Sequence, residues 1–147
     1  MWGTRFPDAD SVHLLEWPEV DAGWVNEFLG QKWTVIRSVR TELTGFIEPL
    51  RREKIIGSSL QANVTVSIGW QDDRYNITQL DFAEIAIVSE ARLTLTDQNI
   101  IADGPTPWVH ANVEVTTNHK CGRCWRHLPE VTEDGALCGR CDTVLSA

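Results

Sequence analysis

The sequence predicts an α+β fold that ends in a small module held together by a metal ion. Three observations support this prediction. Apolar residues recur at every third or fourth position through 24–54, which is the period of an amphipathic helix. Segments 61–68, 91–96 and 109–117 alternate between apolar and polar residues, as half-buried strands do. All four cysteines lie in the last quarter of the chain, in two identical Cys-Gly-Arg-Cys pairs.

Residues 1–23 are expected to form an irregular N-terminal segment. We expect a short extended or helical piece over 11–15 and a turn at Trp17-Pro18, because a residue before proline avoids the helical region. His13 has no companion at ligand spacing, so we interpret it as a packing or surface histidine rather than as a metal ligand.

One long amphipathic helix is predicted from Trp24 onward. Pro49 lacks an amide hydrogen and its ring opposes the carbonyl of Gly45, so we expect a kink or a break near Glu48. The helix should then resume and stop at Gly57, acting as its C-terminal cap. Its apolar stripe is larger than the rest of the chain can easily cover, which suggests partner helices outside this sequence.

The segment after Gly57 predicts a small mixed sheet with a short helix. In order, the expected elements are a strand over 61–68, a short helix over 72–82, strands over 83–88 and 91–96, a loop over 97–107 and a strand over 109–117. In the first strand, Val64, Val66 and Ile68 share one face, so we expect this face to be buried.

The cysteine pairs predict a structural zinc site. Each Cys-x-x-Cys turn lets two sulfurs converge on one ion, and the thirteen residues between the pairs can double back to complete a tetrahedron. The predicted ligands are Cys121, Cys124, Cys138 and Cys141. Four protein ligands leave no position for water, so the site is structural rather than catalytic. Two disulfides, four free thiols and a rubredoxin-like iron site are the alternatives, and the matched spacing with no export signal favours zinc.

The residues around the cysteines suit such a site. Gly122 and Gly139 can take positive φ, which would turn backbone amides toward the sulfurs. Four cations are placed to offset the negative charge of four thiolates around a dication: Lys120, Arg123, Arg126 and Arg140.

The charge distribution leaves nucleic acid open as a partner. A net charge of -8 and a pI near 4.9 argue at first against it, because phosphate selects for positive surfaces. However, six of the thirteen Lys and Arg residues fall within 32–54 and four within 120–140. An acidic chain can therefore still present a basic strip. Because the chain contains neither a membrane-length apolar run nor a hydrophobic signal core, we expect a cytoplasmic protein with no membrane partner.

Three stretches resemble the C-terminal end of bacterial-type isoleucyl-tRNA synthetases. The Cys-Gly-Arg-Cys-Trp segment at 121–125, with Leu-Cys-Gly-Arg-Cys at 137–141, resembles that family's terminal zinc finger. A similar module ends the formamidopyrimidine-type DNA glycosylases. Residues 50–62 resemble the helix exit and strand entry that close the anticodon-binding helical domain. Residues 11–14 with Trp17-Pro18 are similar to the approach to its last long helix.

The resemblance implies a C-terminal piece made of three parts. These are the end of a helical anticodon-binding domain over 1–57, a small α+β junction domain over 58–117 and a zinc-finger domain over 118–147. The class signatures His-Ile-Gly-His and Lys-Met-Ser-Lys-Ser do not occur here, so we expect no catalytic residue in this piece. ATP-dependent ligation of isoleucine to tRNA would belong to a catalytic domain absent from it. The implied partners are isoleucine tRNA and the rest of a monomeric synthetase.

The resemblance also implies the residues that contact tRNA. Arg123 and Trp125 would touch the anticodon region, where unpaired bases stack on aromatic side chains. Lys120 and Arg126, with His127, would add phosphate contacts. The alternative for Trp125 is a hydrophobic plug under the zinc turn, and for Arg123 it is charge compensation for the thiolates.

Two rival functions remain at this point. The chain could be the zinc-finger fragment of a formamidopyrimidine-type DNA glycosylase, although the long helix and sheet do not resemble that enzyme. It could also be a stand-alone zinc-ribbon module in which Trp125 and Val131 meet another protein.

Overall fold

A computed structural model describes residues 2–6, 8, 11–69, 75–96 and 107–146. The chain divides into two compact units, Met1–Gly30 and Gln31–Ala147. In the first unit a short helix, α1 (Trp2–Arg5), is followed by 3-10 turns at Val12–Leu14 and Ala22–Trp24. The predicted irregular N-terminal segment is confirmed. Of the two forms expected for residues 11–15, the structure has the helical one, the 3-10 turn at Val12–Leu14. The predicted turn at Trp17-Pro18 is wrong, because residues 16–21 carry no turn.

Helix α2 (Glu27–Arg52) begins three residues later than predicted, and the side chain of Asn26 accepts a hydrogen bond from the Leu29 amide at 2.9 Å. One face of the helix is buried through Val35, Ile36, Val39, Leu43 and Ile47. The apolar residues of its first turns are exposed instead: Phe28, Leu29 and Trp33. The predicted stripe is therefore covered over only part of its length.

Of the kink or break predicted near Glu48, the break is wrong, since α2 continues through Pro49 to Arg52. A proline near the end of a helix removes only one amide bond, and the turn after Pro49 is closed by the amide of Glu53 at 2.9 Å. The predicted cap at Gly57 is also wrong. Lys54 takes the left-handed position with φ 60°. The amides of Lys54 and Ile55 bond back to Arg51 and Leu50, which is a Schellman ending.

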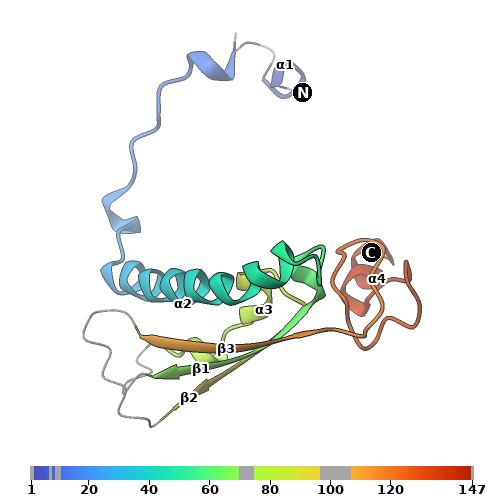
Figure 1. Cartoon of the computed structure of the whole chain (residues 1–147). Coiled ribbons are helices and arrows are strands. Elements are labelled where there is room, and N and C mark those ends of the chain that lie inside the picture. Colours follow the sequence, from blue (N-terminus) through green and yellow to red (C-terminus); the bar gives the residue numbers. More distant parts are fainter. Residues whose placement is uncertain (1, 7, 9–10, 70–74, 97–106, 147) are drawn as a thin grey trace. The chain divides into compact units, whose positions relative to one another are not determined.

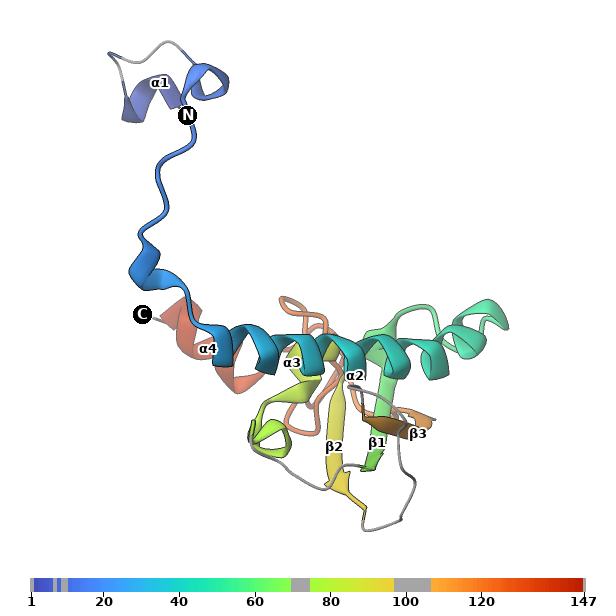
Figure 2. The same ribbon diagram turned by 90° about the vertical axis from the view of Figure 1, so that its left-hand side faces the viewer.

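The sheet contains three strands, β1 (Ala62–Gly69), β2 (Glu90–Leu95) and β3 (Trp108–Val115), in the order β2-β1-β3. Strand β1 pairs parallel with β2 and antiparallel with β3, which confirms a mixed sheet. Val64, Val66 and Ile68 are buried on one face, as predicted. Helix α2 runs across the sheet in both views (Figures 1 and 2) and shares one hydrophobic core with this face.

The predicted strand over 83–88 is wrong, because this segment forms the short helix α3 (Phe82–Ala86). Its apolar run is equally compatible with a buried helix. The Asp81 carboxylate caps its first turn by accepting from the Glu84 amide at 3.3 Å, and Ile87 ends it with φ 58°. Of the short helix predicted over 72–82, the described residues form a 3-10 turn at Ile77–Gln79, and Phe82 is already the first residue of α3. The predicted loop over 97–107 lies almost entirely outside the described residues.

The chain ends in a cysteine-bearing module, residues 118–146, that we call the finger. It contains an isolated β-bridge between Lys120 and His127 and one helix, α4 (Gly139–Ser146). Within the described ranges, no helix has the length and apolarity needed to cross a membrane.

Candidate metal centre and nucleic-acid interface

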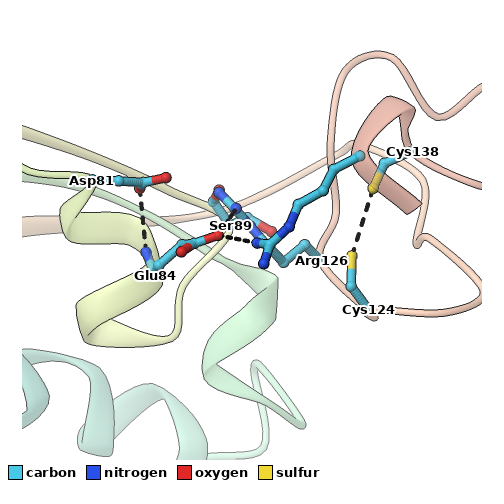
Figure 3. A network of polar contacts seen from close by, with 7 residues as sticks. Asp81, Glu84, Ser89, Cys124, Arg126 and Cys138 are labelled. Atoms are coloured by element: carbon cyan, nitrogen blue, oxygen red, sulfur yellow. Dashed lines mark hydrogen bonds and ion pairs between the residues drawn. The ribbon is translucent and has the colours of Figure 1, made fainter. Parts of the chain in front are cut away.

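The four cysteines converge in the finger. Their Sγ atoms all lie within 4.8 Å of one another, and those of Cys124 and Cys138 are 3.8 Å apart (Figure 3). Tetrahedral zinc with Zn–S bonds of about 2.3 Å places sulfurs roughly 3.8 Å apart, whereas a disulfide needs about 2.0 Å. All four thiols are free. The donor set therefore fits a zinc ion and does not fit two disulfides.

The thiols have very different acidities. Burial raises the pKa of Cys121, but the backbone amides of Cys124, Cys138 and Arg123 outweigh it and lower that pKa to about 6. One of these amides, from Cys138, donates to the Cys121 sulfur at 3.3 Å. Burial and the neighbouring sulfurs raise the pKa of Cys124 to about 12. Without a cation the cluster does not hold four thiolates, and a bound dication would offset their mutual repulsion.

Backbone hydrogen bonds build the turn that carries the first cysteine pair. The amide of Cys121 donates to the Arg126 carbonyl at 2.9 Å, and the amide of Trp125 donates back to Cys121 at 3.0 Å. The prediction of positive φ at Gly122 and Gly139 is wrong, and among the described finger residues the left-handed positions belong to Trp125 (φ 65°) and Gly135 (φ 96°).

Gly122 is required for a different reason. A Cβ atom at this position would lie 2.4 Å from the Gly135 carbonyl oxygen, which is closer than real contacts allow. The two segments are joined here by hydrogen bonds from Gly135 to Lys120 and from Gly122 to Ala136. The second loop thus closes directly over the first cysteine turn.

Little apolar surface is buried in the finger. Its core consists of Cys121, Cys138, Cys141 and Val131, with Cys124, Leu128 and Ala136 partly buried against it. Trp125 is not part of this core, and 62% of it is exposed. This exposure argues against the reading of Trp125 as a hydrophobic plug.

Trp125 borders a pocket of about 400 Å³. The pocket is lined by Ser58, Leu60, Gln61, Lys120, Trp125, His127 and Asp134. The His127 ring is oriented by Nδ1, which donates to the Asn118 carbonyl at 2.9 Å. The Lys120 amide donates to the Asp134 carboxylate at 2.7 Å, and this bond lowers the pKa of Asp134. The site combines an exposed aromatic ring with polar groups of both signs.

The four predicted cations of the finger fall into two pairs. Arg126 and Arg140 both approach Glu84 of α3, with Arg126 Nη1 at 3.8 Å from Glu84 Oε1. Arg126 Nη2 also donates to the Ser89 carbonyl at 3.0 Å (Figure 3). Lys120 and Arg123 are exposed, and in the described part of the chain neither side chain forms a hydrogen bond or ion pair.

Two residues at this junction were missed by the sequence analysis, Glu84 and Ser89. The sequence placed Glu84 in a strand and assigned no role to either residue. No local signal marks them, because their side-chain partners are distant in the sequence: those in the finger are 38 to 56 residues away, and Leu60 is 29 residues from Ser89.

The finger matches a known family. Residues 118–144 fit the family described as a zinc finger found in FPG and IleRS. This finding and the clustered sulfurs together support structural zinc rather than iron.

Nearly the whole chain is similar to part of larger proteins. It is 52% identical over 145 residues to isoleucine--tRNA ligase of Zymomonas mobilis, covering 99% of this chain and 14% of that protein. The ligase of Gluconobacter oxydans is 42% identical, with 99% and 15% covered. The ligase of Natranaerobius thermophilus is 31% identical, with 92% and 16% covered. The chain thus spans about one seventh of these relatives. The resemblance to isoleucine--tRNA ligases is confirmed, as a segment that ends in their type of zinc finger.

Proposed function

We propose that this chain is the tRNA-binding C-terminal region of an isoleucine--tRNA ligase and recognises the anticodon region of isoleucine tRNA. The observation that carries the proposal is the state of Trp125, which is 62% exposed while its backbone has φ 65°. Such a backbone costs a non-glycine residue about 1–2 kcal/mol. Because the ring is exposed, its packing in the finger offsets little of this conformational free energy. The ring is therefore available to an external partner. Stacking of an unpaired base on an aromatic ring contributes about 1–3 kcal/mol.

The polar groups near Trp125 suit an RNA loop. Lys120 and Arg123 are exposed cations that would bind phosphates or base edges. Arg126 remains a predicted contact, but it is the weakest of them, because its guanidinium already binds the Ser89 carbonyl and lies near Glu84.

Zinc would have a structural role in this surface. Cys121, Cys124, Cys138 and Cys141 would hold it with their four sulfurs. When bound, the ion ties the first cysteine turn to the start of α4, so that residues 122–125 keep one conformation.

The chemistry would lie elsewhere in the synthetase. Activation of isoleucine with ATP would belong to a catalytic domain, and this chain would supply binding through the three parts 1–57, 58–117 and 118–147. The exposed Phe28, Leu29 and Trp33 of α2 support contact with the rest of the enzyme. We expect the complete enzyme to act as a cytoplasmic monomer.

A hybrid enzyme tests the proposal. In the Zymomonas mobilis ligase, the matching 145 residues are replaced by this chain, and Trp125→Ala is introduced. Charging of isoleucine tRNA should fall about tenfold, as expected for the loss of one stacking contact. Isoleucyl-adenylate formation should not change. Trp125→Phe should keep part of the charging, and Arg123→Ala tests the second predicted contact.

Leu145→Ala is the matched control. Leu145 lies in the same module, is 61% exposed and does not line the pocket. This variant should charge tRNA like the unmodified hybrid. Equal loss of adenylate formation and charging in Trp125→Ala would contradict the anticodon role.

A further inference from the structure

Ser89 carries a polar side chain and is nevertheless buried, at 2% exposure. It lies between α3 and β2, and each of its polar groups has a partner. Its amide donates to the Ala62 carbonyl at 3.0 Å, and its carbonyl accepts from Arg126 at 3.0 Å. Its hydroxyl donates to the Leu60 carbonyl at 2.5 Å and accepts from the His127 amide at 2.9 Å. One small residue thus connects three separate segments.

Two of these segments form the walls of the pocket beside Trp125. Leu60 belongs to the wall contributed by the turn before β1, and His127 belongs to the wall contributed by the finger. The Ser89 hydroxyl bonds to both at once. The distance between the walls is therefore set by a residue that does not itself line this pocket.

Glu84 provides a second contact between the finger and the segment that carries Ser89. Its carboxylate forms ion pairs with Arg126 and Arg140. Asp81 caps the helix α3 that carries Glu84 (Figure 3). Arg126 thus reaches both Glu84 and the Ser89 carbonyl from a position next to Trp125. The hydrogen bonds of Ser89 and the ion pairs of Glu84 hold the finger in one orientation on the α3–β2 junction.

We propose that Ser89 and Glu84 are positioning residues for RNA recognition, because they fix Trp125 and Lys120 of the finger across a pocket from Ser58–Gln61. The inference rests on the proposed RNA-binding function, and it assigns a role to two residues that touch no RNA. Buried hydrogen bonds to a hydroxyl are costly to lose, so a change at Ser89 should loosen the finger.

Direct RNA binding by the zinc-loaded 147-residue chain tests this role. The probe is an RNA hairpin that carries the anticodon loop of isoleucine tRNA, and fluorescence anisotropy at one fixed salt concentration measures the dissociation constant. Ser89→Ala and Glu84→Gln should each weaken binding, by about tenfold for the buried hydroxyl and by less for the exposed carboxylate.

Glu90→Gln is the matched control. Glu90 is adjacent to Ser89, is exposed like Glu84 and pairs with Arg92 of the same strand rather than with the finger. Removal of a negative charge by itself favours RNA binding. Glu90→Gln should therefore bind RNA as well as the unmodified chain or slightly better. The positioning role predicts the opposite sign for Glu84→Gln.

A second measurement reports the geometry without RNA. In the chain labelled with 5-fluorotryptophan, the resonance of Trp125 is assigned by its loss in Trp125→Phe. Ser89→Ala and Glu84→Gln should shift or broaden this resonance while zinc content equals that of the unmodified chain and both variants remain folded at the temperature of the measurement.

Three results would overturn the inference. The first is unchanged RNA affinity in both variants while Trp125→Ala weakens binding. The second is equal weakening in Glu90→Gln. The third is an affinity loss that only follows zinc loss or unfolding. If instead Trp125→Ala leaves RNA affinity unchanged, the proposed function fails, and the inference fails with it.

Discussion

The two hydrophobic clusters of unit Gln31–Ala147 are stabilised in different ways. The cluster under α2 contains seventeen buried residues, drawn from α2, the sheet and the segments that connect these elements. The finger cluster contains four, and three of these are cysteines. The first cluster buries enough apolar surface to hold a fold, whereas a module the size of the finger usually depends on a metal ion.

One chain can therefore use two different sources of stability. Burial is spread over many side chains, so each contributes a modest share. Metal ligation is concentrated in one site, and binding there is folding free energy for the module. The two regions should therefore respond to different perturbations.

Zinc removal should have the largest effect. Structural zinc contributes about 10–16 kcal/mol in small zinc-finger peptides, so a strong chelator or Cys138→Ser should unfold the finger. Amide resonances of 118–146 should collapse to unfolded positions, while those of α2 and β1–β3 keep their dispersion. Zinc content measured in parallel links the change to the ion. Loss of the sheet at the same chelator concentration would show that the two regions are not independent.

A cavity made by substitution under α2 should have the next largest effect on stability. It should destabilise the helix and sheet rather than the finger. Leu43 is fully buried, so Leu43→Ala should lower the free energy of unfolding of the helix and sheet by about 2–5 kcal/mol. Denaturant unfolding followed by amide resonances of β1 gives this value. Zinc content should not change, and Thr44→Ala, an exposed position on the same helix, is the control.

Acid titration of Asp134 should have the smallest effect. The Lys120 amide holds the pKa of this carboxyl below the usual aspartate range, so its contribution is present above that range and is lost as pH falls through the lowered pKa. Asp134→Asn keeps an acceptor oxygen but does not titrate.

The measurement compares the two proteins. The unmodified finger should unfold at a higher temperature than the Asn variant at neutral pH, and the difference should narrow as the pH falls toward that pKa, over the pH range in which zinc content measured in parallel shows the ion still bound. A difference that is constant with pH would exclude the carboxylate as its source.

Much of the fold followed from periodicity. The spacing of Ile36, Val39 and Leu43 predicted α2, and alternation predicted β1, β2 and β3 to within a few residues. One failure occurred where a short apolar run is compatible with more than one structure. The segment 83–88 became α3 because Asp81 caps it and Phe82 packs into the core. The end of α2 was placed at a glycine, but Lys54 takes the left-handed position.

The four-cysteine cluster and the alternating strands could both be predicted without a structure. Ligand spacing and side-chain alternation are local properties, so they can be read without knowledge of the fold. The exposure of Trp125 and the hydrogen bonds by which Ser89 joins the walls of the pocket depend instead on how distant segments pack together. Ser89 is 29 residues from Leu60 and 38 from His127, and no pattern along the chain encodes contacts at such separations. They arise because β2, the turn before β1 and the finger meet in space.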